Sequence, residues 1–164
     1  MKKLVVLVVF GLLTISTFAQ KLGHINSGEV LQLLMNEEGV VKKLKDKKTI
    51  YQDLLIKSKT TFDNDVKDYQ DNIDKYTDSD REMIEQELVE AQQKLMQSEQ
   101  LYNKKIQEYQ QELINPLEEK IIKSISLIAE RGKYTYIFDS SVGVLLYFKE
   151  SEDITDKVKK ELGL

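Results

Sequence analysis

The chain has 164 residues, a formal net charge of −4 at neutral pH and no cysteine. The lack of cysteine excludes disulfides, thiolate metal sites and lipid attachment to cysteine. Charged residues make up 32% of the chain and aromatic residues 8%, which favours helices that have one narrow apolar stripe and solvated flanks. The acidic balance argues against nucleic acid as a partner.

Residues 1–19 are predicted to be a signal peptide. Two lysines precede an apolar run at residues 4–13, and residues 17–19 resemble the small-x-small site of signal peptidase, so cleavage is expected after Ala19. Removing those two lysines leaves 22 basic against 28 acidic residues, a net charge of −6. The mature chain is expected to be exported and soluble, and a retained N-terminal membrane anchor is the alternative.

Residues 20–39 are predicted to begin a small body that contains β-structure. Residues 21–25 are compatible with a short strand, and Ser27 can cap a helix that ends before Gly39. The rest of this α+β body is expected from the other end of the chain, at residues 116–164, with a helical arm inserted between the two parts.

Residues 40–115 are predicted to form that arm, a long antiparallel α-helical hairpin with its tip near residues 77–80. Apolar residues recur at intervals of three, four or seven, and seven apolar pairs have residue numbers that sum to 157. Ser79 or Asp80 is expected to cap the returning helix. The predicted seam of this coiled coil consists of Leu44, Tyr51, Leu55, Phe62, Val66, Tyr69, Ile73, Ile84, Leu88, Ala91, Leu95, Tyr102, Ile106 and Leu113.

Six further apolar residues lie beside the seam positions and are candidates for binding an unfolded client. Flexible methionine and aliphatic side chains can hold a chain weakly and without sequence preference. Widening of the seam, or contact with a neighbouring arm, is the alternative role. These candidates are Ile50, Leu54, Met83, Val89, Met96 and Leu101.

Charge is distributed unevenly along the first helix of the hairpin. Residues 42–59 carry seven lysines against two aspartates, and residues 60–80 carry seven aspartates against two lysines. A solvated helix surface explains such runs, and a field that guides a charged partner is the alternative.

Residues 116–164 are predicted to complete the body with a helix, a β-hairpin and a C-terminal helix. Pro116 indicates a kink or a restart of the helix, which Gly132 can end. Residues 134–138 and 144–148 are β-branched and aromatic and indicate a hairpin, and Thr155 is the expected cap of the last helix.

The body is expected to associate with other copies of the chain. It contains only about seventy residues and lacks disulfides, so its own core is small. One apolar run without alternation suggests a strand that is covered on both faces, either at a subunit interface or within one protomer. This candidate oligomerisation segment consists of Val144, Leu145, Leu146, Tyr147 and Phe148.

No catalytic, metal or cofactor site is predicted. The single histidine, His24, has no second ligand nearby and is assigned a packing or surface role. The spaced aspartates at residues 63–74 lack the glycine turn and terminal glutamate of a calcium loop. No nucleophile elbow, phosphate loop or paired-histidine helix is present in the sequence.

The mature chain opens with Lys21-Leu-Gly-His-Ile-Asn-Ser27, and after the charged hairpin it ends with Tyr134-Thr-Tyr-Ile-Phe-Asp139, Val144-Leu-Leu-Tyr147 and Asp153-Ile-Thr155. Together with the signal peptide, this pattern resembles the Skp/OmpH family of periplasmic chaperones over essentially the whole mature chain. The resemblance implies a periplasmic homotrimer whose bodies join through β-strands. It also implies three arms that enclose a cavity for unfolded outer-membrane proteins.

The functional interpretation is an ATP-independent holdase that takes part in outer membrane protein biogenesis by binding unfolded β-barrel proteins and preventing their aggregation. A structural or adaptor coiled-coil protein of the cell envelope, binding a folded partner, is the alternative. An enzyme is the third class, disfavoured by the lack of motifs. The family's best-known members are strongly basic along the arms, whereas this chain is acidic, so contact with a membrane remains an open alternative.

Overall fold

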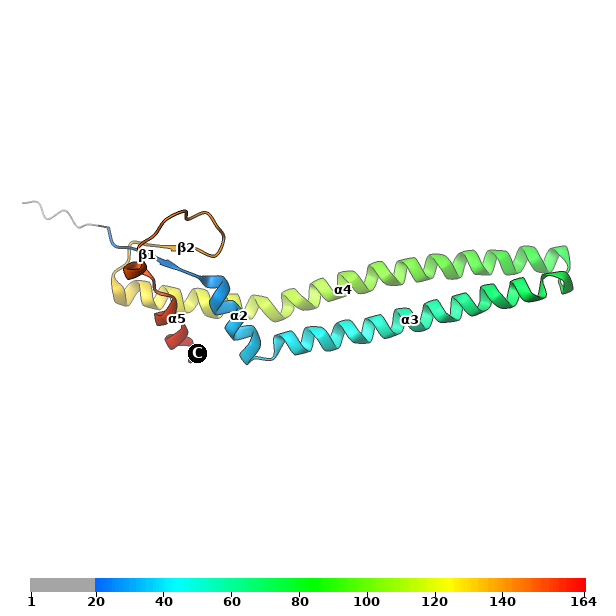
Figure 1. The fold of residues 1–164 in the computed structure, drawn as a ribbon, viewed down its shortest axis with the longest axis horizontal. Coiled ribbons are helices and arrows are strands. Elements are labelled where there is room, and N and C mark those ends of the chain that lie inside the picture. The colour runs from blue at the N-terminus through cyan, green and yellow to red at the C-terminus, as the bar shows by residue number, and fades with distance from the viewer. Residues whose placement is uncertain (1–19) are drawn as a thin grey trace, which may run out of the picture. The chain divides into compact units, whose positions relative to one another are not determined.

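The computed structural model of the chain describes residues 20–164, and the predicted signal peptide lies outside the described residues. The elements, in chain order, are β1 (Leu22–Ile25), α2 (Ser27–Glu37), α3 (Val40–Asn72), η1 (Ile73–Lys75), α4 (Asp78–Gly132), β2 (Tyr136–Asp139), η2 (Glu150–Glu152) and α5 (Thr155–Leu162). The predicted fold class is confirmed, because the chain is mostly helical, has a two-stranded sheet and folds its long helices into a hairpin (Figure 1).

The described residues form two compact units. One unit, here called the terminal unit, consists of residues 20–30 and 121–164. The other, the hairpin unit, consists of residues 31–120. Each unit is described separately below.

The sheet of the terminal unit pairs the two ends of the mature chain. β1 and β2 are parallel, with Leu22 opposite Tyr136 and Ile25 opposite Asp139. The predicted hairpin of residues 134–138 with 144–148 is therefore wrong for the single chain, and residues 144–149 have neither helix nor strand. β2 pairs with β1 along one edge only, and the apolar run that follows β2 forms no strand beside it.

The turn after β2 is held by Asp139. Its carboxylate accepts hydrogen bonds from the hydroxyl and N–H of Ser27 and, at 2.7 and 2.9 Å, from the hydroxyl and N–H of Ser141. Partial burial acts to raise the pKa of Asp139, but the bonds from Ser27 and Ser141 outweigh it, and the pKa lies below its ordinary value. These bonds stabilise the fold above the pKa of the unfolded carboxyl, and that stability is lost as the pH falls through the lowered folded pKa.

The core of the terminal unit joins residues from four segments. Its apolar side chains are fully or almost fully buried, and they are Ile25, Val30, Ile121, Ile154 and Val158. Three polar side chains, His24, Ser124 and Thr155, are also buried. Because α5 is short, its stability must come mainly from placing Ile154 and Val158 in this core.

The ring of Tyr134 lies close to two glycines of the same unit, Gly23 and Gly132. A Cβ atom added at Gly132 would overlap Cε2 of Tyr134, and one added at Gly23 would lie 2.9 Å from its Cε1. The Lys21 Nζ atom lies 4.0 Å from the centre of the ring, within cation–π range. Glycine is therefore required at both positions for this placement of the Tyr134 ring.

At the starts of three helices, the residues that accept the first N–H groups differ from the predicted capping residues. The Asn26 side chain, rather than Ser27, accepts a hydrogen bond from the N–H of Glu29 at the start of α2. At the tip, Thr77 and Asp80 accept hydrogen bonds from each other's N–H groups at 3.2 Å, so Thr77 is the capping residue of α4. Thr155 is the first residue of α5, and its N–H donates to Asp153.

Helix α4 continues through Pro116 instead of restarting there. The element runs unbroken from Asp78 to Gly132, with the proline in its interior. The side chains of Leu34, Val40 and Leu117 are buried in the hairpin unit. Burial of Leu117 directly after the proline provides packing that can offset the hydrogen bond that proline cannot donate.

Candidate functional site

The helical hairpin is joined by aromatic contacts along its length. The rings of Tyr51 and Tyr102 stack with their centroids 4.7 Å apart and their planes 11° from parallel. The Nζ atom of Lys47 lies 5.3 and 5.5 Å from the ring centres of Tyr51 and Tyr109. These contacts fix how far α3 and α4 are shifted along each other.

A second set of contacts joins the helices near the tip. The Tyr69 hydroxyl donates to a carboxylate oxygen of Glu85 at 2.6 Å, and Arg81 donates from Nε to the carbonyl of Ile73 at 3.1 Å. The hydrogen bond to Glu85, followed by desolvation, raises the pKa of Tyr69. Tyr69 therefore remains a protonated donor, and it is the buried aromatic residue of the hairpin unit.

The predicted seam residues lie mostly inside the hairpin. Thirteen of the fourteen are at least partly buried, and Ile73 is the exception at 37% exposure. The aromatic stack pairs Tyr51 with Tyr102, whereas a strict sum of 157 would place Tyr51 opposite Ile106. The difference is about one helical turn, which is the offset expected when a side chain packs between two residues of the facing helix.

Replacing Tyr102 by alanine is expected to lower the free energy of unfolding by about 2 kcal/mol, because the stack on Tyr51 and its partly buried area are lost. Urea titration followed by circular dichroism at the helical band measures this change. Tyr102→Phe is the matched control, since it keeps the ring and removes only the hydroxyl, and its midpoint should stay near that of the unchanged chain. Equal losses in both variants would contradict a role for the stack.

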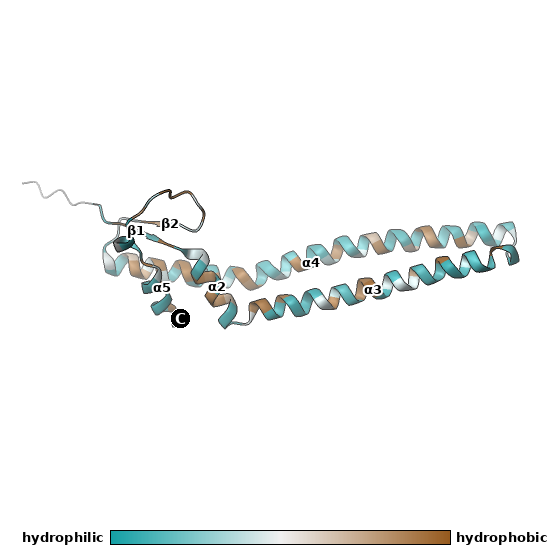
Figure 2. Ribbon diagram, in the orientation of Figure 1, coloured by the Kyte–Doolittle hydropathy of each residue, from teal (hydrophilic) through white to brown (hydrophobic). Residues whose placement is uncertain are grey.

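The six candidate client-binding residues are all exposed. Their side chains are between 42% and 55% exposed in the single chain. Figure 2 shows such apolar positions recurring between polar ones along α3 and α4. Two further exposed residues of the same kind, Val41 and Ile56, were missed, although Ile56 directly follows the seam residue Leu55. A search for all apolar positions off the seam would have found them.

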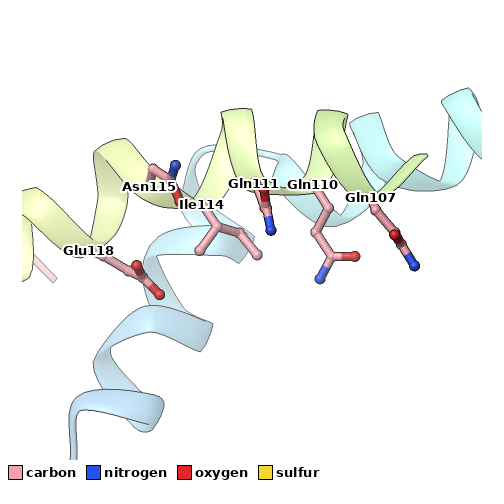
Figure 3. A pocket seen from close by; sticks show the side chains of 6 residues that line it. All are labelled: Gln107, Gln110, Gln111, Ile114, Asn115 and Glu118. Carbon is pink, nitrogen blue, oxygen red and sulfur yellow. The ribbon is translucent and has the colours of Figure 1, made fainter. Parts of the chain in front are cut away.

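A polar groove lies on α4, with a volume of about 430 Å³. Figure 3 shows Gln107, Gln110 and Ile114 leaving one side of the helix into it. The remaining lining residues are Gln111, Asn115 and Glu118. Side-chain amides carry donors and an acceptor without charge, so this surface can hydrogen-bond a peptide backbone of any sequence. The spacing of its glutamines at three and four residues is the signal that could have predicted it.

The candidate oligomerisation segment lies on the surface of the terminal unit. Leu146 is 95% exposed and Tyr147 is 80% exposed, and Val144 is similarly accessible. The segment is attached at its end, where Lys149 O lies 3.0 Å from Nε2 of buried His24 and the rings of His24 and Phe148 lie 4.1 Å apart. The Nδ1 atom of His24 has no hydrogen-bond partner among the described residues. His24 is therefore a buried residue that packs against the end of this segment.

The exposed segment adjoins further apolar surface. A cavity of about 230 Å³ is lined from β1 and β2 by Leu22 and Phe138 and from the segment by Leu145, Tyr147 and Phe148. Leu22, Tyr136 and Phe138 are each about half exposed, although they belong to the only sheet in residues 20–164. Contiguous apolar surface of this kind is typical of an interaction site.

Two kinds of site are not found in the part of the chain that the structure describes. No group of three or more acidic or histidine side chains is placed to hold a metal ion within residues 20–164. None of the helices described has the length and apolar character needed to cross a membrane.

Comparison with known proteins gives a family and a related structure. Residues 21–162 match the profile of a family described as "Outer membrane protein (OmpH-like)". A crystal structure from Caulobacter crescentus CB15, described as that of a candidate OmpH-like outer membrane chaperone, superposes with a TM-score of 0.75 at 17% sequence identity. The alignment covers 87% of this chain and 83% of the other, and it shows a shared fold. A comparison with curated protein sequences finds no match.

Proposed function

Because this chain belongs to the OmpH-like family of outer membrane proteins, a family of periplasmic chaperones and not of enzymes, we propose that it is an ATP-independent holdase for unfolded outer-membrane β-barrel proteins. The holdase binds an unfolded client between helical arms and prevents its aggregation. Three chains assemble through the terminal units, so that three hairpins surround one client. Export with cleavage after Ala19 places the mature chain in the periplasm.

The observation that carries this proposal is the exposed apolar surface on the hairpin. Its seam aromatics are already engaged with each other, as the stack of Tyr51 on Tyr102 shows, so they are poor contacts for a client. The six exposed residues named above remain available, spread along α3 and α4. Each can bury only a small apolar area, so binding is weak at any one point and gains strength from many contacts.

The weakness of the individual contacts also supplies a way to release the client. No nucleotide-binding motif is present in the sequence, so ATP hydrolysis does not drive release. Contacts that exchange rapidly let a client leave to a receiver that binds it more tightly. The holdase therefore keeps its client unfolded without trapping it.

Assembly is supported by the apolar surface of the terminal unit. Four of the five residues at 144–148, all except Leu145, are exposed in one chain next to the half-exposed face of β1 and β2. Exposed segments with unpaired backbone groups readily pair with another chain. In the proposed trimer, each segment 144–148 lies against the terminal unit of a neighbouring protomer.

The first experiment measures the mass of the mature protein by light scattering after gel filtration, alone and with an outer-membrane β-barrel protein diluted from urea. The expected result is a mass of three protomers that gains one client, together with suppressed aggregation of the barrel protein. An assembly that ignores the unfolded barrel but binds one folded envelope protein would replace the holdase with an adaptor function.

Replacing Ile50, Leu54, Met96 and Leu101 by serine is expected to weaken client holding several-fold while the assembly keeps its mass. The reason is that about half of each side chain is exposed, so the change removes client contacts without opening a core. Suppression of barrel-protein aggregation, measured by turbidity at increasing chaperone concentration, checks this result.

The matched control replaces Gln70, Gln92, Gln93 and Gln100 by serine. These residues are exposed on the same two helices, and the change costs helix propensity without removing apolar area. Unchanged holding in the first variant, or equal weakening in both, would sink the assignment of the six residues.

A further inference from the structure

A second groove in the hairpin unit combines apolar and cationic side chains. It has a volume of about 460 Å³ and is formed at the end of α2 and the beginning of α3. Three of its lining residues are apolar, two are cationic and two are uncharged and polar. They are Met35, Val41, Leu44, Lys45, Lys48, Thr49 and Gln52.

The two lysines of this groove are available to a ligand. Both side chains are exposed, and neither has a carboxylate partner among residues 20–164. Val41 beside them is 52% exposed. The groove therefore presents apolar surface and unneutralised positive charge together. A lysine stem can cover apolar surface while its ammonium group stays in water, so the two features are compatible.

The charge around the groove differs from the charge on the rest of the hairpin. Residues 42–59 carry seven lysines against two aspartates, whereas residues 60–99 carry twelve carboxylates against four cations. Beyond about 10 Å at moderate salt, exposed charges are screened, so a ligand in the groove senses mainly the lysines nearby. Anionic segments are attracted to this groove and repelled from the outer half of the same hairpin.

We propose that this groove holds client segments in which an aliphatic or aromatic side chain is flanked by carboxylates. The inference rests on the proposed holdase function and names the class of segment that the beginning of α3 selects. The apolar side chain of the segment lies against Met35, Val41 and Leu44. Its carboxylates pair with Lys45 and Lys48. A lysine-flanked segment finds the same apolar surface but meets like charge.

Three synthetic peptides test this selection with the full mature protein. They share their leucine and phenylalanine positions and differ in having glutamate, glutamine or lysine between them. Binding is followed by fluorescence anisotropy at low and high NaCl. The glutamate peptide is expected to bind about five-fold more tightly than the glutamine peptide at low salt, which is the effect of two exposed ion pairs. The lysine peptide should bind most weakly.

A double variant tests whether the preference for the glutamate peptide arises in this groove. Lys45→Gln with Lys48→Gln should abolish the difference between the glutamate and glutamine peptides. The matched control is Lys43→Gln with Lys59→Gln, which removes the same net charge from the same helix at residues that do not line the groove. The control should retain most of the preference. Circular dichroism of both variants verifies that the helices are unchanged.

The outcomes separate this inference from the holdase function. Aggregation of an unfolded barrel protein is measured with the same samples. If aggregation is suppressed but the glutamate and glutamine peptides bind equally, or if the control loses the preference as fully as the groove variant, the groove inference is wrong and the holdase stands. If no peptide binds and aggregation proceeds unchanged, both proposals are overturned.

Discussion

Replacing Ile154 by alanine is expected to lower the free energy of unfolding of the terminal unit by about 3 kcal/mol. Ile154 is completely buried and precedes α5, whose Val158 is buried in the same core. Removing its side chain leaves a cavity that the small core cannot refill. A loss of this size is a large fraction of the stability of a unit of this size, so partial unfolding at room temperature is expected.

Urea unfolding of the mature chain, followed by tyrosine fluorescence and by circular dichroism, measures this loss. Three of the eight tyrosines belong to the terminal unit and five to the hairpin unit, so the fluorescence reports both units, and circular dichroism is dominated by the hairpin helices. The part of the fluorescence change that moves to lower urea in the Ile154 variant, ahead of the circular dichroism transition, measures the terminal unit. Ile122→Ala is the control, because Ile122 is 61% exposed on α4. It should change the free energy of unfolding by less than about 0.5 kcal/mol. A similar midpoint for both variants would show that Ile154 is not the centre of the core.

Replacing Leu146 and Tyr147 by serine is expected to convert the proposed trimer into single chains. Both side chains are almost fully exposed in one protomer, so the substitution costs that protomer little. Burial of an apolar side chain stabilises by about 2 kcal/mol, so six such side chains in three protomers contribute on the order of 10 kcal/mol to assembly. Loss of that contribution should dissociate the assembly at micromolar concentration.

Light scattering after gel filtration measures this change as a fall in mass from three protomers to one. Val142→Ser is the control, since Val142 is 65% exposed but lies outside the segment at residues 144–148. The control is expected to keep the mass of the unchanged protein. A double variant that still elutes as the full assembly, with unchanged circular dichroism, would remove residues 144–148 from the interface.

The hairpin could be predicted from the sequence because its contacts are periodic. Long helices without glycine leave few places for the chain to bend, and the apolar spacing puts one stripe on each helix. The exact shift between the helices could not be predicted, because packing between helices tolerates offsets of a turn. The stack of Tyr51 on Tyr102 and the bond from Tyr69 to Glu85 decide it.

The caps and the sheet show where local patterns were insufficient. Helices α2 and α4 are capped by Asn26 and Thr77, where Ser27 and either Ser79 or Asp80 were expected. The first N–H group of α5 donates to Asp153, where Thr155 was expected as the cap. Neighbouring serine, threonine and aspartate residues all have suitable side chains, so spacing alone does not choose between them. The candidate site was predicted only in part, because the groove that contains Met35 and Lys45 combines residues whose neighbourhood depends on how α2 and α3 pack.

The sequence by itself determined the helical hairpin, the division between charged arm and apolar ends, and the family to which the chain belongs. These features depend on neighbouring or regularly spaced residues, so they can be recognised from the sequence alone. Only the tertiary structure decided that β2 pairs in parallel with β1, that residues 144–148 form no strand and are mostly exposed, and that Lys45 and Lys48 share a groove with Met35. The parallel pairing joins residues more than one hundred positions apart, and burial of Ile25 and Ile154 in one core, rather than any local preference, stabilises it.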